Sequence, residues 1–235
     1  LTTAKNEPWI NLGLFADADE IPEMDHLFLN ESDLYVTLQL LDRNNQYKAS
    51  LAGQIVRIAR DDLKDTQNGP LTPTMDNFTL ACKNPYTRIS SYGEHKLIIG
   101  CVGNWLEKDS MGITVFDLQE GTSSLLYTGY ELGGPIHQLV TDETKSIYAM
   151  VSIVGSNVWD IESMNLLQIN ESIKILHSSP DFNLAGLAHD QDYLFFGNRS
   201  QSTQAGLWHY DLHTDSVSGP FSTTAPPHDL VIITP

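Results

Sequence analysis

A short acidic segment near the start of the chain has the clearest chemical character in the sequence. Its candidate metal ligands are Asp17, Asp19, Glu20, Glu23 and His26. Ca²⁺ binds several oxygen ligands, and alternating Asp17 and Asp19 could present two of them from one turn. The central glycine and the distant glutamate of a full calcium-binding loop are missing. Calcium binding and a solvated acidic loop are therefore both open interpretations.

Cationic and aromatic side chains form a second candidate site, suited to a carboxylate, a glycan or a peptide. The candidate ligand-binding residues are Arg43, Tyr86, Arg88, Trp105, His137 and Arg199. The alternative is structural, because an arginine can equally pair with a neighbouring carboxylate such as Asp42. The choice between the two interpretations depends on which strands and loops carry these side chains.

Histidines and catalytic motifs give a weaker signal. His26, His137 and His189 fall at or near the ends of expected inner strands, and a transition-metal site would need at least three such groups together. Isolated turn histidines are the alternative. The sequence contains no G-x-S-x-G, H-E-x-x-H, phosphate-binding loop or Cys-x-x-Cys motif. It therefore favours a protein that is not an enzyme, and no catalytic residue is predicted.

A repeated segment indicates the elements that position these side chains. Residues 112–121 (GITVFDLQEG) have the pattern of a strand followed by an acidic residue and a polar turn. Similar segments begin at residues 53, 156 and 206, so the four starts are 59, 44 and 50 residues apart, the length of a four-stranded propeller blade. The recurring acidic residues, expected to cap turns, are Asp117, Asp160 and Asp211.

The predicted fold is all-β, a β-propeller of four-stranded antiparallel blades in a single domain over residues 1–235. Helical periodicity is missing, and the expected second strands are nearly continuous apolar runs, typical of strands packed on both faces. The four units are expected at about 26–82, 86–130, 136–170 and 184–221. An outer strand is expected at 9–15 and a closing strand at 229–233.

Strand parity predicts where a binding site lies. In an up-and-down blade, the loop between the second and third strands emerges on the same face as the connection to the next blade. We call this the loop face. Binding groups usually lie on loops that a rigid scaffold holds. The expected segments of this face are 16–25, 42–45, 83–85, 103–110, 133–135, 153–156, 178–183 and 199–204.

Composition limits the partners. The 235 residues carry 13 basic and 30 acidic side chains, for a formal charge of −17, so nucleic acid is not an expected partner. No stretch has the 18 or more apolar residues of a membrane span. Cys82 and Cys101 are expected near the same end of neighbouring strands, where a disulfide is geometrically reasonable and would favour an extracytoplasmic location. Two free buried thiols are the alternative.

The segments 19–45, 83–89 (KNPYTRI) and 129–136 (GYELGGPI) resemble bacterial surface β-propellers of the YVTN-repeat lipoprotein type. The resemblance implies a secreted or outer-surface protein, a lipid anchor outside this sequence, and a ring of about seven blades to which these four units would belong. A self-contained small propeller is the alternative. It implies no common catalytic residues.

The sequence thus predicts an extracytoplasmic binding or scaffold module at the cell surface, with a protein, glycan or small-molecule partner. A metal-binding protein or an enzyme with its site on the loop face is the alternative. No cofactor is predicted apart from Ca²⁺ as the candidate ion of the acidic segment.

Overall fold

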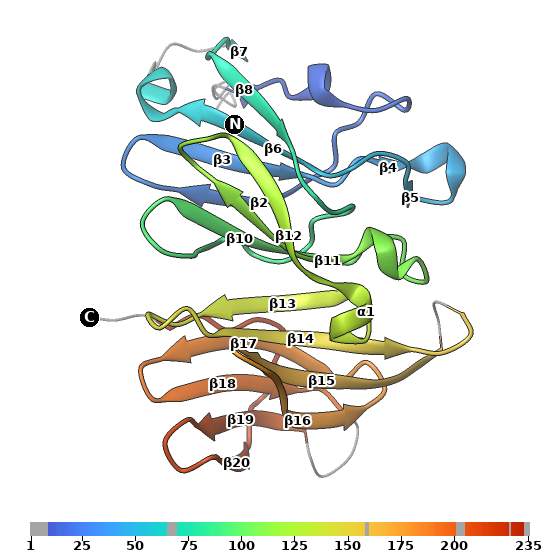
Figure 1. Cartoon of the computed structure of the whole chain (residues 1–235), viewed down its shortest axis with the longest axis vertical. Helices are drawn as coiled ribbons and strands as arrows, with labels where there is room; N and C mark the ends of the chain where they lie inside the picture. The colour runs from blue at the N-terminus through green and yellow to red at the C-terminus, as the bar shows by residue number, and fades with distance from the viewer. Residues whose placement is uncertain (1–8, 65–69, 158–159, 201–204, 226, 233–235) are drawn as a thin grey trace, which may run out of the picture.

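The computed structural model describes residues 9–64, 70–157, 160–200, 205–225 and 227–232. They form four antiparallel sheets of four strands each, arranged as a β-propeller (Figure 1). The first blade contains β2 (Met24–Leu29), β3 (Asp33–Leu38), β6 (Gln54–Ala59) and β8 (Met75–Thr79). The second contains β9 (Ser90–Ser91), β10 (Lys96–Cys101), β11 (Gly112–Asp117) and β12 (Thr122–Thr128).

The third and fourth blades repeat this order from the inner to the outer strand. The third contains β13 (Ile136–Thr141), β14 (Ile147–Val154), β15 (Ile161–Ile169) and β16 (Ile173–Pro180). The fourth contains β17 (Leu184–Asp190), β18 (Tyr193–Asn198), β19 (Gly206–Asp211) and β20 (Ser216–Phe221). The predicted fold class is confirmed.

Several short strands and helical turns lie outside the four blade sheets. β1 (Trp9–Ile10) pairs in parallel with β7 (Pro70–Leu71), and β4 (Leu41–Asp42) pairs with β5 (Lys48–Ala49). The helical turns are η1 (Gly13–Phe15), η2 (Arg43–Asn45), η3 (Arg60–Lys64), η4 (Lys108–Ser110) and the α-helical turn α1 (Gly129–Leu132).

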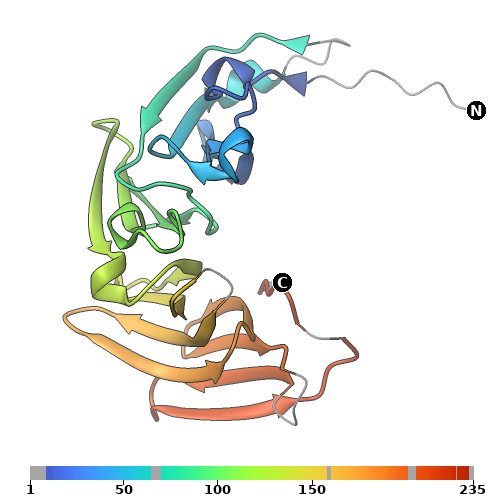
Figure 2. The ribbon, with the colours of Figure 1, turned by 90° about the vertical axis from the view of Figure 1, so that its right-hand side faces the viewer.

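Apolar packing between consecutive blades holds the sheets together. The second strands are buried on both faces, as their apolar runs predict, with Leu38, Ile98, Ala149 and Phe196 fully buried. Separate clusters of buried side chains join the first blade to the second, the second to the third and the third to the fourth. The blades follow one another along an open arc (Figure 2).

This order places two sets of loops on one face. The loops between second and third strands, including β4 and β5, emerge at the right of Figure 1 with α1 and the other connections between blades. The same face is turned toward the viewer in Figure 2. The predicted loop face therefore exists as a physical surface, and the hairpin turns between first and second strands lie at the opposite end.

The two terminal strands differ from the prediction. Only Trp9–Ile10 of the expected strand at 9–15 is extended, because the Asn11 side chain accepts a hydrogen bond from the Gly13 amide at 2.9 Å and turns the chain into η1. The expected closing strand at 229–233 is irregular over the described residues 227–232. There Pro227 packs over Gly197, and Asp229 and Leu230 pack against Gly186. Residue 233 lies outside the described ranges.

The third blade extends ten residues beyond its expected end. The unit is expected to end at residue 170, but its third and outer strands are β15 and β16, which end at Ile169 and Pro180. Asp160 lies in the loop before β15, where its carbonyl accepts the Gly155 amide at 2.7 Å. The turn after β15 is formed at Asn170, whose side-chain oxygen Oδ1 accepts a hydrogen bond from the Ser172 amide at 3.2 Å. The segment that begins at residue 156 therefore covers the loop before β15 and the start of that strand, and not a complete strand with the turn after it.

The other two recurring aspartates occupy the expected position. Asp117 and Asp211 end β11 and β19, and each carboxylate accepts two backbone amides of the following turn at 2.8–3.1 Å. These hydrogen bonds lower the pKa of both carboxyls, the one from Glu120 most at Asp117 and the one from Thr214 most at Asp211. Both side chains cap turns, as predicted.

Candidate functional site

A pocket on the loop face gathers side chains from three blades. Its volume is about 690 Å³, within the usual range of small-molecule sites. We call it the aromatic pocket, because each contributing region supplies one aromatic ring. Its lining residues are Gln46, Tyr47, Lys48, Gly103, Asn104, Trp105, Ile161 and Phe182. One lysine and no carboxylate belong to this set, although the chain has 30 acidic residues.

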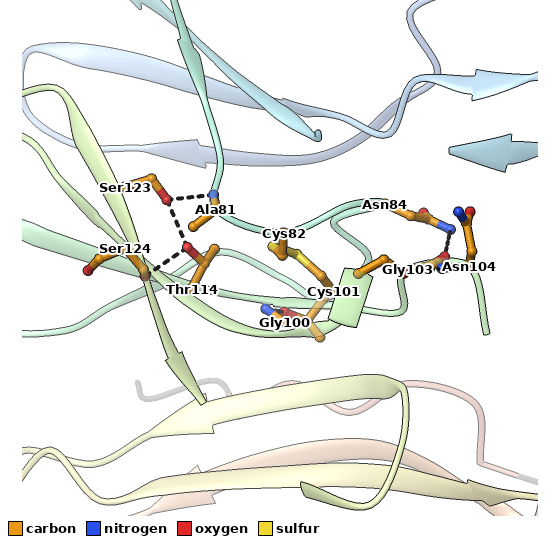
Figure 3. Close-up of a disulfide and its surroundings, with 12 residues drawn as sticks. Ala81, Cys82, Asn84, Gly100, Cys101, Gly103, Asn104, Thr114, Ser123 and Ser124 are labelled. Carbon is orange, nitrogen blue, oxygen red and sulfur yellow. Dashed lines mark hydrogen bonds between the residues drawn. A yellow bond between two sulfur atoms is a disulfide. The ribbon is translucent and has the colours of Figure 1, made fainter. Parts of the chain in front are cut away.

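The loop that carries Trp105 is held by a disulfide and by backbone pairing. Cys82 and Cys101 are both buried and joined, with their Cα atoms 6.1 Å apart, which confirms the expected disulfide (Figure 3). Beside it the Asn84 side chain donates to the Gly103 carbonyl at 3.3 Å (Figure 3). The Trp105 amide then donates to the Val102 carbonyl at 3.3 Å, and the loop turns with Trp105 at a φ of +56°.

Asn104 ties this loop to the first blade. Its Oδ1 accepts the Ala49 amide at 2.8 Å and its Nδ2 donates to the Ala49 carbonyl at 3.3 Å. Ala49 follows directly on Lys48 and is fully buried. Tyr47 is fixed from the other side, because its amide donates to the Asp42 carbonyl at 2.9 Å. The Tyr47 ring itself is 61% exposed and free to contact a ligand.

Phe182 comes from the connection between the third and fourth blades, next to Arg199. The Arg199 guanidinium lies over the Phe182 ring at 5.5 Å from its centroid, and Nη2 donates to the Phe182 carbonyl at 3.2 Å. A cation over an aromatic face is attracted by the negative charge density of that face. This places a positive charge immediately beside the aromatic pocket.

His137 lies beneath the rings of the pocket. Its own ring is 4.8 Å from Phe182, 5.4 Å from Trp105 and 5.9 Å from Tyr86, measured between centroids. Burial, and secondarily the nearby charge of Arg199, lower the pKa of His137 to about 3, so the imidazole is neutral at physiological pH. Its Nε2 is 2.9 Å from the Ser152 hydroxyl, while Nδ1 is buried without a hydrogen-bond partner.

The structure brings four of the six predicted ligand-binding residues together. Tyr86, Trp105 and His137 are in ring contact, and Arg199 joins them through Phe182. The other two are engaged elsewhere. Arg43 donates to Glu23 at 3.3 Å, and Arg88 pairs with Asp229 and donates to the Leu230 carbonyl. These two arginines follow the structural alternative of pairing with carboxylates.

The carboxylates of the acidic segment accept hydrogen bonds from its own loops. Asp19 accepts the amides of Ile21 at 2.9 Å and Arg43 at 3.0 Å, and the Arg43 bond contributes most to lowering the pKa of Asp19. Glu23 accepts the Leu41 amide at 3.0 Å, and Asp17 accepts the Asp19 amide at 3.2 Å. Within the described ranges, no three His, Cys, Asp or Glu side chains are grouped so as to hold a metal ion. Calcium binding stays an untested prediction.

Two of the three histidines lie at opposite ends of the blades. His137 is the second residue of β13, at the loop face. His189 is near the end of β17 and lines a second pocket of about 730 Å³ among hairpin turns. We call this second pocket the polar pocket. His26 lies at the loop face, where its Nε2 donates to the Tyr86 carbonyl at 3.0 Å. A central histidine cluster therefore does not form from these three residues.

Of the eight residues that line the aromatic pocket, only Trp105 is among the predicted ligand-binding residues, and Tyr47, Lys48 and Phe182 are the main additions. Tyr47 and Lys48 follow η2 in a polar loop, and Phe182 stands between Asp181 and Asn183 in a short connection. The sequence does contain one signal for Tyr47 and Phe182. An aromatic residue among polar loop residues does not contribute to the apolar core, so a binding role is a reasonable explanation for it. The sequence does not show that these loops converge on one pocket.

Comparison with known proteins supports the fold. No protein-family model matches the chain, and no curated protein matches its sequence. Among solved structures, the chain is similar to the extracellular domain of a hybrid two-component system, BT4673, from B. thetaiotaomicron, at 13% identity and a TM-score of 0.58. The match covers 88% of this chain and 25% of that one, so this chain spans a quarter of its structural neighbour.

Two further structures match less closely. A functionally unknown protein from Desulfotomaculum acetoxidans has 12% identity and a TM-score of 0.47, with 85% of this chain and 58% of that one covered. The Pan2 WD40 domain from Neurospora crassa has 11% identity and a TM-score of 0.42, with 84% and 65% covered. In the residues described, no helix has the length and apolar character that a membrane crossing needs.

Proposed function

We propose that this protein is an extracytoplasmic binding module that holds a protein, glycan or small-molecule partner in the aromatic pocket. The observation that carries the proposal is the convergence of Tyr47, Trp105 and Phe182 from separate blades onto one pocket. Exposed aromatic rings on a rigid scaffold provide large contact areas at little cost in conformational entropy.

The location rests on independent observations. The disulfide between Cys82 and Cys101 is typical of an oxidising compartment, and a structural neighbour is an extracellular domain. Surface attachment through a lipid anchor and membership of a larger YVTN-type ring belong to the same proposal. They are supported by the sequence resemblance alone.

A binding role fits the chemistry of the pocket better than catalysis. Its one buried titratable neighbour, His137, has a pKa of about 3 and is too weak a base to accept a proton near neutral pH. The pocket lining itself contains no carboxylate, histidine or cysteine. Stacking and hydrogen bonding are the interactions that this set of residues offers.

The test is to probe an array of glycans and peptides with labelled protein and with two matched variants. Tyr47→Ala removes a ring that is 61% exposed in the pocket, and Tyr130→Ala removes a ring that is 64% exposed on α1, outside it. We expect array partners of the protein to be lost with Tyr47→Ala and retained with Tyr130→Ala. Equal binding by both variants would contradict the proposal.

A further inference from the structure

The residues that line the aromatic pocket include one cation and no carboxylate, in contrast to the acidic molecule as a whole. The chain has a formal charge of −17, yet Lys48 lines the pocket and Arg199 borders it. Among the described residues, neither cation has a carboxylate within ion-pair distance, whereas Arg43, Arg57, Arg88, Lys96 and Lys174 each have one. Two uncompensated cations beside a pocket without carboxylates favour an anionic group on the ligand.

The shape of the remaining surface favours a ring with an apolar face. Trp105, Phe182 and Tyr47 line the pocket from three separate loops. The C–H groups on one face of a pyranose pack well against such a ring, while its hydroxyls remain at the edge. The Gln46 carboxamide lines the same pocket and makes no hydrogen bond within the described structure, so it can donate to and accept from hydroxyls.

An extended peptide fits this pocket less well. Peptides bound as strands need free backbone donors and acceptors on the protein. Here the amides of Tyr47, Ala49, Asn104 and Trp105 are already bonded to Asp42, Asn104, Ser110 and Val102 respectively. Recognition must therefore come from side chains, namely rings, one carboxamide and two cations.

Resting on the proposed function, we infer that the aromatic pocket binds a carboxylate-bearing saccharide, such as a uronic-acid unit of an acidic polysaccharide. The sugar ring stacks on Trp105, and its carboxylate is directed toward Lys48 and Arg199. Gln46 contacts the hydroxyls. The neutral His137 beneath the rings supports the aromatic cluster without adding a charge that varies with physiological pH.

The test is calorimetric titration with a short oligogalacturonate and with its methyl ester, which has the same sugar rings without the negative charges. We expect the free acid to bind and the ester to bind about ten- to a hundredfold more weakly, since the ester cannot form charge-assisted hydrogen bonds to the two cations. Equal binding of the acid and the ester would overturn the inference. So would tighter binding of a tetraglutamate peptide, which would indicate an acidic peptide as ligand.

Variants separate the role of Lys48 from general electrostatic attraction. Lys48→Gln removes an exposed cation of the aromatic pocket, and Lys145→Gln removes an exposed cation of the polar pocket. Both changes alter the net charge equally and neither disturbs the core. We expect oligogalacturonate affinity to fall roughly tenfold with Lys48→Gln alone. Equal losses for the two variants would contradict the inference.

The outcome also distinguishes this inference from the proposed function. If no acidic saccharide binds while the array yields partners that depend on Tyr47, the ligand class is wrong and the binding module stands. If the array partners do not depend on Tyr47, the proposed function itself fails.

Discussion

The aromatic pocket and the polar pocket lie at opposite ends of the blades and have similar volumes, about 690 and 730 Å³. The polar pocket contains Asp142, Thr144, Lys145, His189 and Asp190 and would be chosen first by counting chemical groups. The two pockets differ in the side chains that line them, because the polar pocket has carboxylates and no Tyr, Trp or Phe, whereas the aromatic pocket has three such rings and no carboxylate. The chemistry of the lining therefore distinguishes the two pockets better than their size does.

Asp142 shows how the polar pocket uses its groups internally. Its Oδ1 accepts the Thr144 hydroxyl at 2.7 Å and the Ser146 amide at 2.9 Å, and its Oδ2 accepts the Tyr148 hydroxyl at 3.0 Å. These bonds close the turn between β13 and β14. Lys48 of the aromatic pocket and Lys145 of the polar pocket both have side chains without a hydrogen-bond or ion-pair partner among the described residues, but only the aromatic pocket is lined by Tyr, Trp and Phe rings. We infer that the polar pocket maintains the blade and the aromatic pocket binds the ligand.

The largest effect is expected from removing the disulfide. Cys82 and Cys101 are 19 residues apart, and closing a loop of this length stabilises a protein by about 3 kcal/mol in the chain-entropy model. We expect the Cys82→Ala/Cys101→Ala variant to lose about this much free energy of unfolding in urea. Hydrogen exchange should rise first in residues 102–110, which the disulfide holds. If hydrogen exchange rose first at the turn that contains Asp142, the disulfide would not be what holds the loop of the aromatic pocket.

A smaller loss is expected from Asp142→Ala on the polar side. The variant leaves the Ser146 amide and the Tyr148 hydroxyl without their acceptor, so we expect the unfolding free energy to fall by about 1–3 kcal/mol. Array binding should be unchanged, because the aromatic pocket is at the other face. Loss of binding at a temperature where the variant is folded would show that the polar pocket takes part in recognition.

Two aspartates should respond oppositely to pH. Burial raises the pKa of Asp25 to about 6, although nearby His26 lowers it in part. For Asp142, burial would raise the pKa, but hydrogen bonds from Thr144, Ser146 and Tyr148 bring it below the usual 3.8. The folded state thus binds a proton more tightly than the unfolded state at Asp25 and less tightly at Asp142.

The sign of each contribution follows from this difference. Between about pH 4 and 6, the Asp25 contribution to stability falls as pH rises, because folding must then bury a charge. The Asp142 contribution is lost only as pH falls below about 4. We expect Asp25→Asn to flatten the stability profile between pH 4 and 6 in urea titrations, and Asp142→Asn to leave that range unchanged. An unchanged slope with Asp25→Asn would contradict the assignment.

The last prediction is that the protonation of His137 has no effect on ligand affinity between pH 5 and 8. With its pKa lowered to about 3 by burial, His137 does not titrate between pH 5 and 8. Ligand affinity at the aromatic pocket should therefore show no step attributable to this residue in that range, and His137→Phe should leave the shape of the pH profile unchanged. A titration near pH 6.5 that disappears in this variant would show that His137 is accessible to water.

Periodicity and strand parity were sufficient to predict the propeller and the loop face. The apolar runs at 33–38, 96–101, 146–151 and 193–198 fall on the buried second strands β3, β10, β14 and β18. Turn sequences were less informative. Asp160 looked like Asp117 and Asp211 but precedes its strand, and only the pairing of β14 with β15 fixes that register.

The site was only partly predictable, for a physical reason. Tyr86, Trp105, His137 and Arg199 were chosen by residue type and loop position, and they do converge. Arg43 and Arg88 were chosen on the same grounds, but Glu23 and Asp229 neutralise them. Whether a cation is paired depends on contacts between segments that are distant in the sequence. Arg88 and Asp229, for example, are 141 residues apart.

Crystallographic soaking with a small set of aromatic, saccharide and carboxylate fragments tests the central claim most directly. The account predicts that fragments occupy the aromatic pocket, stacked on Trp105 or Phe182, and leave the polar pocket vacant. Fragments bound beside Asp142 and His189, with none against Trp105, would contradict it.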